Sequence, residues 1–400
     1  MKKTIALLLA AVMLLSLLAA CSKTEAPAEE PAQEEQTTEA PAQEETPAEE
    51  PEQPAEEQPS QEELDQEAAD NVAALIDAIY VQERTDDTDA QCEAAKAAWD
   101  ALTDAQKELV EGEEASPEYF GRDTGDASLD DARNQDEIGE NELLVVSFGT
   151  SYNDSRRETI GAIEAAMQTA FPDYSVRRGF TSQIIIDHVN KRDGEKIDNV
   201  TEALDRAVAN GVKNLVVQPT HLMNGLEYTD LKNELAGYSD SFEKIALGEP
   251  LLTSDDDFQK VMNAIVDATK EYDDGETAIC FMGHGTEADS NSVYTKMQET
   301  LTAAGHTNYF VGTVEATPSL DDVIAAVKES GFKKVVLRPL MIVAGDHANN
   351  DMAGDEDGSW KTEFEKAGFE VTTVVEGLGG LTDIQNLFVA HAQAAVDSLK

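Results

Sequence analysis

Two histidines and a glutamate follow three apolar stretches in the C-terminal part of the chain. His284 comes after AICFMG, Glu315 after YFVGTV, and His347 after VVLRPLMIVAGD. Imidazole nitrogen and carboxylate oxygen are ligands for borderline divalent metals such as cobalt, nickel, iron or zinc. A lone histidine in a loop is more often a hydrogen-bonded structural residue, so the hypothesis depends on the three side chains converging. The sequence predicts a metal site formed by His284, Glu315 and His347.

Convergence requires a fold that brings separate strand ends to one edge. From residue 141 onward, short apolar stretches such as LLVVSFG alternate with amphipathic helical patterns such as QIIIDHVNKR and VTEALDRAVANG. This alternation is typical of an α/β fold with a parallel sheet covered by helices on both faces. Ligands of such sheets bind at the carboxyl ends of the strands, which is where the three candidate residues lie.

The α/β region contains an internal repeat. TAICFMGHGT is similar to ELLVVSFGTS, and VKESGFKKVVLRPLMIVAGD is similar to AVANGVKNLVVQPTHLMNG. The offset between Pro219 and Pro339 is 120 residues. We expect two similar lobes, residues 141–270 and 271–400, facing each other across a cleft. The last helical pattern, LTDIQNLFVAHAQAAVDSL, either completes the second lobe or crosses back to the first.

Several motifs in about the last 260 residues resemble the anaerobic sirohydrochlorin cobalt chelatase family, whose members are class II tetrapyrrole chelatases. The matching phrases are SFGTSY, GFTS, VVQPTHLMNGLEY, MGHGT, VGTVEATPSLDDVI and, most specifically, LRPLMIVAGDHANNDMAGDEDGSW. The resemblance implies that His284, Glu315 and His347 bind the metal, and that His284 and Glu315 are catalytic, with His284 as the proton acceptor. It also implies Co²⁺ as the metal substrate, although the residue types alone admit Fe²⁺ or Ni²⁺.

The chain departs from the family pattern at one position near the HGT motif. The family commonly carries another histidine there, in a phrase like HGTEHPAN, whereas this chain reads HGTEADSN, with Ala288 at that place. Asn291 and Tyr294 still fit the pattern.

Other residues are candidates for contacts with an acidic tetrapyrrole. Thr150 and His221 follow strands of the first lobe and are candidate substrate contacts, since the loop of His221 could face the cleft, and Glu227 corresponds to His347 in the repeat. Cations near the strand motifs could bind carboxylates, or could equally be solvated surface residues: Arg177, Arg178, Arg338, Lys333 and Lys334. Three further histidines on expected helices or turns are interpreted as surface residues: His188, His306 and His391.

The N-terminus has the pattern of an export signal. Two lysines, an apolar run and Leu18-Ala19-Ala20-Cys21 resemble a bacterial lipobox, which implies cleavage before Cys21 and lipidation of its thiol. We therefore predict a signal peptide over residues 1–21 and an extracytoplasmic protein anchored to the membrane by lipid. Residues 22–64 contain 15 Glu and 7 of the 13 Pro residues, so this segment should be a disordered tether.

A small helical module is expected over residues 65–115, followed by an acidic connector over 116–140. Val72, Leu75 and Ile76 recur at helical spacing, and Thr103 precedes Gln106 at the spacing of a capping box. The segment resembles small helical modules of surface proteins from anaerobic Gram-positive bacteria. It contains no histidine and is interpreted as a spacer or docking module.

The charge limits the classes of function. With 81 acidic and 29 basic residues the net charge is −52, so a general nucleic-acid-binding role is excluded and an anionic ligand needs a local basic patch. Two hypotheses remain: a cobalt chelatase of cobalamin biosynthesis, and a non-catalytic lipoprotein that binds or hands over haem-like tetrapyrroles or metal ions. The metal-ligand set favours the first, whereas the export signal favours the second. A homo-oligomer is compatible with the sequence.

Overall fold

The computed structural model describes residues 60–79, 87–117, 119 and 125–399. The predicted signal peptide 1–21, including Cys21, lies outside these ranges, as does nearly all of the predicted tether 22–64. Within the described ranges, no helix is both long enough and apolar enough to span a bilayer.

The N-terminal helices form a small apolar core with the first lobe. They are α2 (Gln61–Asp77), α3 (Thr88–Ala101) and α4 (Asp104–Lys107). Helix α2 begins inside the predicted tether because Ser60 and Glu63 form a capping box. Thr103 and Gln106 form the reciprocal hydrogen bonds expected from their spacing. Ile184 of the first lobe belongs to the core of these helices, so the module is packed against the α/β region.

The first lobe contains a four-stranded parallel sheet in the order β2-β1-β3-β4. Its strands are β1 (Asn141–Ser147), β2 (Ser175–Phe180), β3 (Asn214–Pro219) and β4 (Lys244–Leu247). Its helical segments are η1 (Ala127–Leu129), α5 (Asn153–Arg156), η2 (Arg157–Gly161), α6 (Ala162–Ala170), α7 (Gln183–Asp193), α8 (Val200–Ala209) and α9 (Leu226–Ala236).

The second lobe repeats the pattern in the order β6-β5-β7-β8, so the predicted two-lobe α/β fold is confirmed. Its strands are β5 (Thr277–Gly283), β6 (Tyr309–Thr313), β7 (Lys334–Pro339) and β8 (Glu370–Thr373). The helical segments of this part of the chain are α10 (Asp255–Ala268), η3 (Lys270–Tyr272), η4 (Asp289–Asn291), α11 (Ser292–Ala303), α12 (Leu320–Ser330), η5 (Ala348–Met352), α13 (Trp360–Lys366), η6 (Leu378–Gly380) and α14 (Thr382–Ser398).

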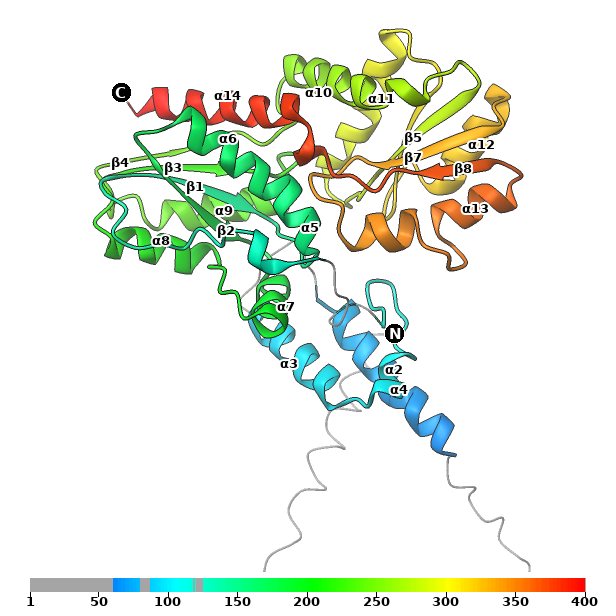
Figure 1. The fold of residues 1–400 in the computed structure, drawn as a ribbon, viewed down its shortest axis with the longest axis horizontal. Helices are drawn as coiled ribbons and strands as arrows, with labels where there is room; N and C mark the ends of the chain where they lie inside the picture. The colour runs from blue at the N-terminus through cyan, green and yellow to red at the C-terminus, as the bar shows by residue number, and fades with distance from the viewer. Residues whose placement is uncertain (1–59, 80–86, 118, 120–124, 400) are drawn as a thin grey trace, which may run out of the picture. The chain divides into compact units, whose positions relative to one another are not determined.

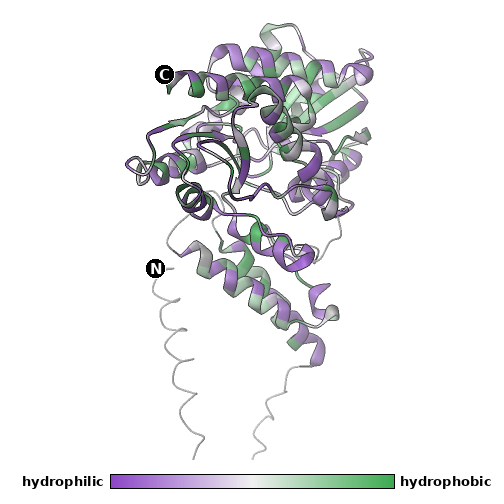
Figure 2. Cartoon of the chain, turned by 60° about the vertical axis from the view of Figure 1, so that its left-hand side comes forward, coloured by the Kyte–Doolittle hydropathy of each residue, from purple (hydrophilic) through white to green (hydrophobic). Residues whose placement is uncertain are grey.

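Each sheet is buried on both faces. Helices α8 and α9 cover one face of the first sheet, and α12 and α13 cover one face of the second. The other faces share a single core, to which α6, α10, α11 and α14 contribute. In Figure 2 the helices carry both hydrophobic and hydrophilic residues, as helices that cover a sheet do. Burial on both faces explains the apolar runs in the central strands β1, β3, β5 and β7.

Two helices cross between the lobes. Helix α14, at the end of the chain, returns to pack on α6 and β3 of the first lobe, which decides between the two alternatives left open by the sequence (Figure 1). Helix α10 packs on both α11 and α14, although the expected boundary at residue 270 assigns it to the first lobe alone. The shared core therefore joins the two lobes.

Candidate metal centre

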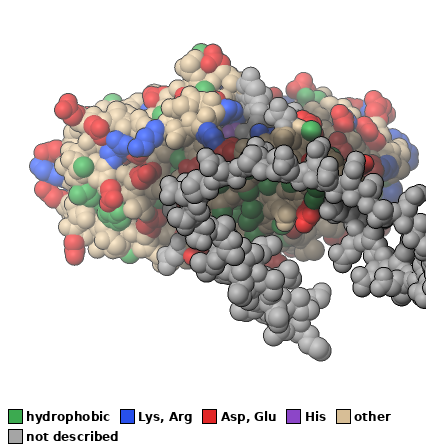
Figure 3. Space-filling view, turned by 90° about the horizontal axis from the view of Figure 1, so that it is seen from below, with side chains coloured by type: hydrophobic (Ala, Val, Ile, Leu, Met, Phe, Trp, Pro, Cys, Tyr) green, Lys and Arg blue, Asp and Glu red, His purple; other side chains and the backbone are tan. Residues whose placement is uncertain are grey.

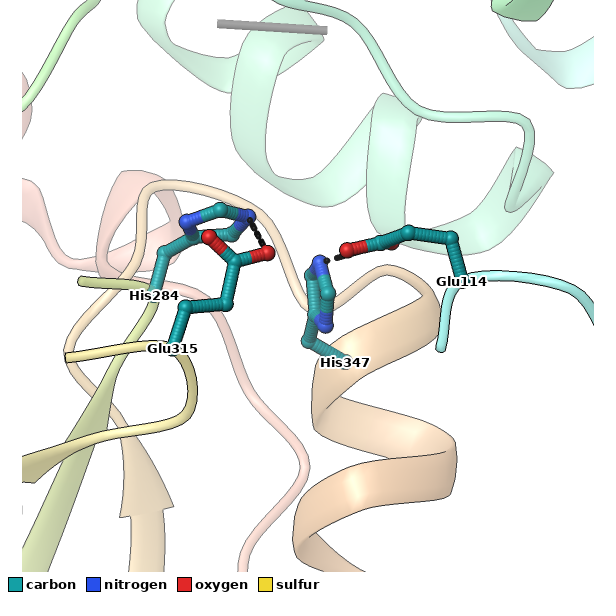
Figure 4. Close-up of side chains that lie close together, drawn as sticks. All are labelled: Glu114, His284, Glu315 and His347. Carbon is teal, nitrogen blue, oxygen red and sulfur yellow. Dashed lines mark ion pairs between the residues drawn. The ribbon is translucent and has the colours of Figure 1, made fainter. Parts of the chain in front are cut away.

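The three residues predicted to form a metal site lie together at the carboxyl ends of the second sheet. His284 directly follows β5, Glu315 lies two residues after β6, and His347 precedes η5. His284 Nε2 is 3.2 Å from Glu315 Oε1, and the two imidazole rings meet edge to face with 4.6 Å between their centroids. Figure 4 shows all three side chains pointing toward a common point.

Backbone geometry holds the loops of His284 and Glu315 together. Gly285 has φ +94°, and a Cβ atom there would lie 2.9 Å from Ala316, so glycine is required at this close approach. The Glu315 N–H donates to the His284 carbonyl at 2.9 Å. Asn291 accepts from the Thr286 N–H and donates to the Thr317 carbonyl, which ties the two loops a second time.

Both histidines present Nε2 to the centre because Nδ1 is already occupied. His284 Nδ1 lies 2.8 Å from the Gly285 carbonyl, which only accepts, so Nδ1 carries the proton and the lone pair is on Nε2. His347 Nδ1 lies 2.7 Å from Asp351 Oδ2, the arrangement of a carboxylate that orients a metal-binding histidine. These second partners fix the tautomer that metal binding requires.

The surroundings shift the pKa values of the two histidines in opposite directions. Burial, followed by the charge of His347, lowers the pKa of His284, so this ring is neutral at pH 7. Burial also acts to lower the pKa of His347, but the carboxylates of Asp351, Glu114 and Asp346 outweigh it and raise that pKa to about 9. Without a metal ion, His347 therefore carries the positive charge of the cluster.

A fourth residue, Glu114, joins the cluster from outside the α/β region. Its Oε2 atom is 3.5 Å from His347 Nε2, and its carboxyl group hydrogen-bonds that of Glu315. One ligand atom from each of the four residues lies within 4.8 Å of the others. Glu114 could not be predicted from the sequence, because it lies in an acidic, turn-rich stretch with no apparent link to the strands.

A cleft of about 290 Å³ adjoins the metal cluster and extends between the lobes. Most of its lining is apolar, including Phe148, Ile160, Ile184, Leu222 and Met341. Thr150 and His221, predicted to contact substrate, both line it and are nearly fully buried. Glu227 also lines it, and burial raises the pKa of this carboxyl group to about 7. Such an apolar cleft beside a polar cluster is suited to a flat organic ligand.

Arg177 and Arg178, predicted as substrate contacts, do not line the cleft. Arg177 pairs with Glu142 and Asp198, and Arg178 pairs with Glu164 and Asp130, all of them buried. Both arginines lie on strand β2, and buried carboxylates bind their guanidinium groups. The prediction that Arg177 and Arg178 contact the substrate is therefore wrong. Asp130 belongs to the expected acidic connector, which is therefore partly built into the first lobe.

Other expected surface residues also have defined partners. Arg338 is buried and donates to the Ala268 carbonyl, while Lys334 begins β7 at the sheet edge opposite the metal cluster. His188 is buried and lines the cleft, and His391 binds Asp257 across the interface of α14 and α10. The interpretation of His188 as a surface residue is wrong, because the N-terminal helices cover it, whereas His391 stays partly exposed.

Comparison with known proteins identifies the family. The model of the cobalt chelatase (CbiK) family matches residues 141–397. The chain belongs to the cobalt chelatase (CbiK) family. This confirms the expectation of a chelatase-family enzyme, while the predicted roles of individual residues remain predictions.

Two relatives of this chain are named as sirohydrochlorin cobaltochelatases. A sirohydrochlorin cobaltochelatase of Salmonella typhimurium is 38% identical over 255 residues, covering 64% of this chain and 96% of the relative. The sirohydrochlorin cobaltochelatase CbiKC of Nitratidesulfovibrio vulgaris is 29% identical over 259 residues, covering 64% and 91%. Among solved structures, SirB from Bacillus subtilis with Fe³⁺ aligns with a TM-score of 0.46 and 14% identity over 65% of this chain and 97% of SirB.

Proposed function

We propose that this protein is a sirohydrochlorin cobaltochelatase, inserting Co²⁺ into sirohydrochlorin in anaerobic cobalamin synthesis. The observation that carries the proposal is the convergence of His284 Nε2, His347 Nε2 and the Glu315 carboxylate beside an apolar cleft. Two imidazoles and one carboxylate hold a divalent ion while leaving a coordination position open for a substrate. The names of the two relatives support the choice of substrate and metal.

The reaction exchanges two pyrrole N–H bonds for bonds to the metal. Co²⁺ is a substrate, held by His284, Glu315 and His347 until the ring nitrogens replace these ligands. The two protons released must pass to a base beside the ring. His284 is suited to that role once the ring nitrogens have taken Co²⁺ from it, because Nε2 is then its unprotonated nitrogen and its Nδ1–H is fixed on the Gly285 carbonyl. Glu315, 3.2 Å away, is placed to pass a proton onward.

The cleft constrains how the tetrapyrrole binds. Among the described residues that line it there is no Lys or Arg, whereas Glu114, Glu227 and Asp346 are present. The apolar side chains therefore suit the faces of the macrocycle, and its carboxylates are expected to project toward solvent. Thr150 and His221 are the polar groups that we propose contact the ring from the first lobe.

We also propose that Cys21 is the lipidated N-terminus of the mature protein, outside the cytoplasmic membrane. The lipobox pattern and the acidic, proline-rich residues 22–64 support this proposal. Growth of the native host with a radiolabelled fatty acid should label the wild-type chain and leave Cys21→Ala unlabelled. Equal labelling of both chains would contradict the anchor.

One observation favours a second candidate, a carrier that holds a metallated tetrapyrrole without inserting metal. His221 is buried in the cleft, and neither of its ring nitrogens has a hydrogen-bond partner among the described residues. A neutral imidazole with a free lone pair is a common axial ligand of haem iron. A carrier would bind haem tightly through His221 and show no metal insertion.

The deciding experiment mixes the full chain, purified in detergent, with sirohydrochlorin and Co²⁺ and follows the absorbance change on metal insertion. We expect His284→Ala and His347→Ala to lower the rate by about 10²–10⁴-fold, as for loss of a base or ligand. His306→Ala is the matched control, because His306 lies on a turn against Tyr309. Parallel reactions with Fe²⁺ and Ni²⁺ rank the metals.

Three outcomes separate the candidates. A rate dependent on His284 and His347 supports the chelatase. No acceleration over the uncatalysed rate, together with haem binding that His221→Ala abolishes, supports the carrier. Equal insertion rates in the wild type and both histidine variants would show that the metal assignment is wrong.

A further inference from the structure

Glu114 belongs to the N-terminal segment, outside the region that matches the chelatase family, yet it lies in the metal cluster. The family match begins at residue 141, so Glu114 precedes it by 27 positions. In Figure 4 its carboxylate points at His347 from the side opposite Glu315 and His284. The N-terminal segment thus contributes a side chain to the predicted metal site.

The position of Glu114 is fixed by a tight turn. The carboxylate of Asp77, at the end of α2, accepts hydrogen bonds from the backbone N–H groups of Glu113, Glu114 and Ala115 at 2.8–3.0 Å. The Gly112 N–H donates to the Ala115 carbonyl at 3.0 Å. A carboxylate that binds three consecutive N–H groups holds the turn, and therefore the start of the Glu114 side chain, in one place.

The N-terminal helices hold this turn against the first lobe. Helix α3 packs on α7, and Cys92, Ala95 and Trp99 share a core with Ile184. Glu114 and Tyr119 both line the cleft. Figure 3 views the molecule from the side on which the N-terminal helices lie, with apolar side chains visible near the middle of that face. The segment therefore covers part of the cleft and carries Glu114 into it.

The cluster has enough ligand atoms to fill all four coordination positions of a tetrahedral metal site. Two carboxyl groups, those of Glu114 and Glu315, and two imidazoles, those of His284 and His347, converge there. Two carboxylates and two neutral imidazoles would neutralise a divalent ion and supply four ligands, the number typical of tetrahedral sites. A site with His284, Glu315 and His347 alone would keep an open position, and Glu114 brings a further carboxylate within 4.8 Å of these three ligands.

We propose that Glu114 is a fourth metal ligand, which closes the site when no tetrapyrrole is bound. This inference rests on the proposed function for the assignment of the metal site itself. The N-terminal segment then holds Co²⁺ in a four-coordinate resting state, and the ring nitrogens of the tetrapyrrole must displace Glu114 before insertion. The segment is accordingly part of the metal-binding machinery, in addition to any role as a spacer.

The test compares Co²⁺ binding by the full chain, purified in detergent, with binding by Glu114→Gln and Glu114→Ala. Glu113→Gln is the matched control, because Glu113 lies on the same turn with its side chain exposed. Titration with Co²⁺, followed by visible absorption, reports both affinity and coordination, since four-coordinate Co²⁺ absorbs more strongly than the hydrated six-coordinate ion. Unfolding curves of each variant show whether the fold is retained.

We expect wild type and Glu113→Gln to share a strong absorption band, and both Glu114 variants to bind Co²⁺ at least about tenfold more weakly with a weaker band. If Glu114→Gln matches Glu113→Gln in affinity and spectrum, Glu114 is only an ion-pair partner of His347 and the proposal fails. If His347→Ala binds Co²⁺ as tightly as the wild type, the assignment of the metal site itself fails. The two failures are therefore distinguishable.

Discussion

At the scale of single residues, the second hydrogen-bond partners of the histidines decide what the cluster can do. A histidine side chain can present either ring nitrogen, and only the contacts of Nδ1 with Gly285 and Asp351 commit both Nε2 atoms to the centre. His221 differs, because burial is the cause of its shifted pKa and no charged group offsets it. The same residue type thus has two distinct electrostatic environments within one cleft.

The burial of His221 predicts a pH-dependent stability. Its pKa is lowered to about 4, so between pH 6.5 and 4 the unfolded chain binds a proton that the folded chain does not. Stability should therefore fall as the pH falls through this window, by about 2 kcal/mol between pH 7.5 and pH 5 from this residue. Urea unfolding at the two pH values should show a smaller loss for His221→Leu. An equal loss in both proteins would contradict the assignment.

The buried arginine pairs predict a second stability effect. Arg178→Met leaves Glu164 and Asp130 desolvated with only Arg133 and Arg156 to compensate them. Removal of one partner from a buried ion pair costs about 3–5 kcal/mol. Arg157→Met is the control, because the partners of Arg157 are more than half exposed, and should change stability by less than about 0.5 kcal/mol. Similar urea midpoints for both variants would contradict this account.

Residues that follow strand ends could be grouped from the sequence, whereas contacts that depend on remote packing could not be predicted. His284, Glu315 and His347 could be grouped because parallel strands deliver their ends to one edge. The partners of Arg177 and Arg178 could not be predicted, since Glu142, Glu164 and Asp198 come from three different elements. Glu114 was missed for the same reason, because nothing in its local sequence distinguishes it from neighbouring acidic residues.

At the scale of elements, apolar runs and amphipathic patterns predicted the alternation of strands and helices, while the ends and packing partners of these elements needed the structure. The run VVLRPLMIVAGD reads as one strand, but β7 ends at Pro339, and the residues after it form a loop that lines the cleft. The crossing of α10 and α14 between the lobes had no sequence signal beyond an amphipathic pattern. Such a pattern shows that one face is buried, and it does not identify the partner.

The loop after β5 provides a test of how an element positions the centre. Gly285→Ala should cost about 1–3 kcal/mol because φ is +94°, and should also displace His284 because the new Cβ meets Ala316. Gly305→Ala has a similar φ of +92° with no atom within 4 Å, so it tests the backbone strain alone. Both variants should lose stability in urea, and only Gly285→Ala should weaken Co²⁺ binding. Equal Co²⁺ affinities would show that the loop tolerates the displacement.

At the scale of the whole molecule, two lobes, a shared core and an N-terminal segment enclose one cleft. The repeat in the sequence predicted the lobes, and the composition predicted the change of character near residue 141. The position of the segment against α7 depends on apolar contacts such as that of Trp99 with the core around Ile184. These contacts join stretches about 85 residues apart, so periodicity alone could not reveal them.

The charge of the whole chain predicts how an acidic tetrapyrrole arrives. A net charge of −52 repels a polycarboxylate, and the described cleft lining offers no Lys or Arg to attract it locally. Salt screens this repulsion, so the association rate of sirohydrochlorin should rise by about two- to tenfold between about 20 mM and about 200 mM NaCl. Stopped-flow absorbance measures the rate, and the methyl ester of the same macrocycle, which lacks the carboxylate charges, is the control. A rate that falls with salt would instead reveal a basic path to the cleft, because only attraction between opposite charges is weakened by screening.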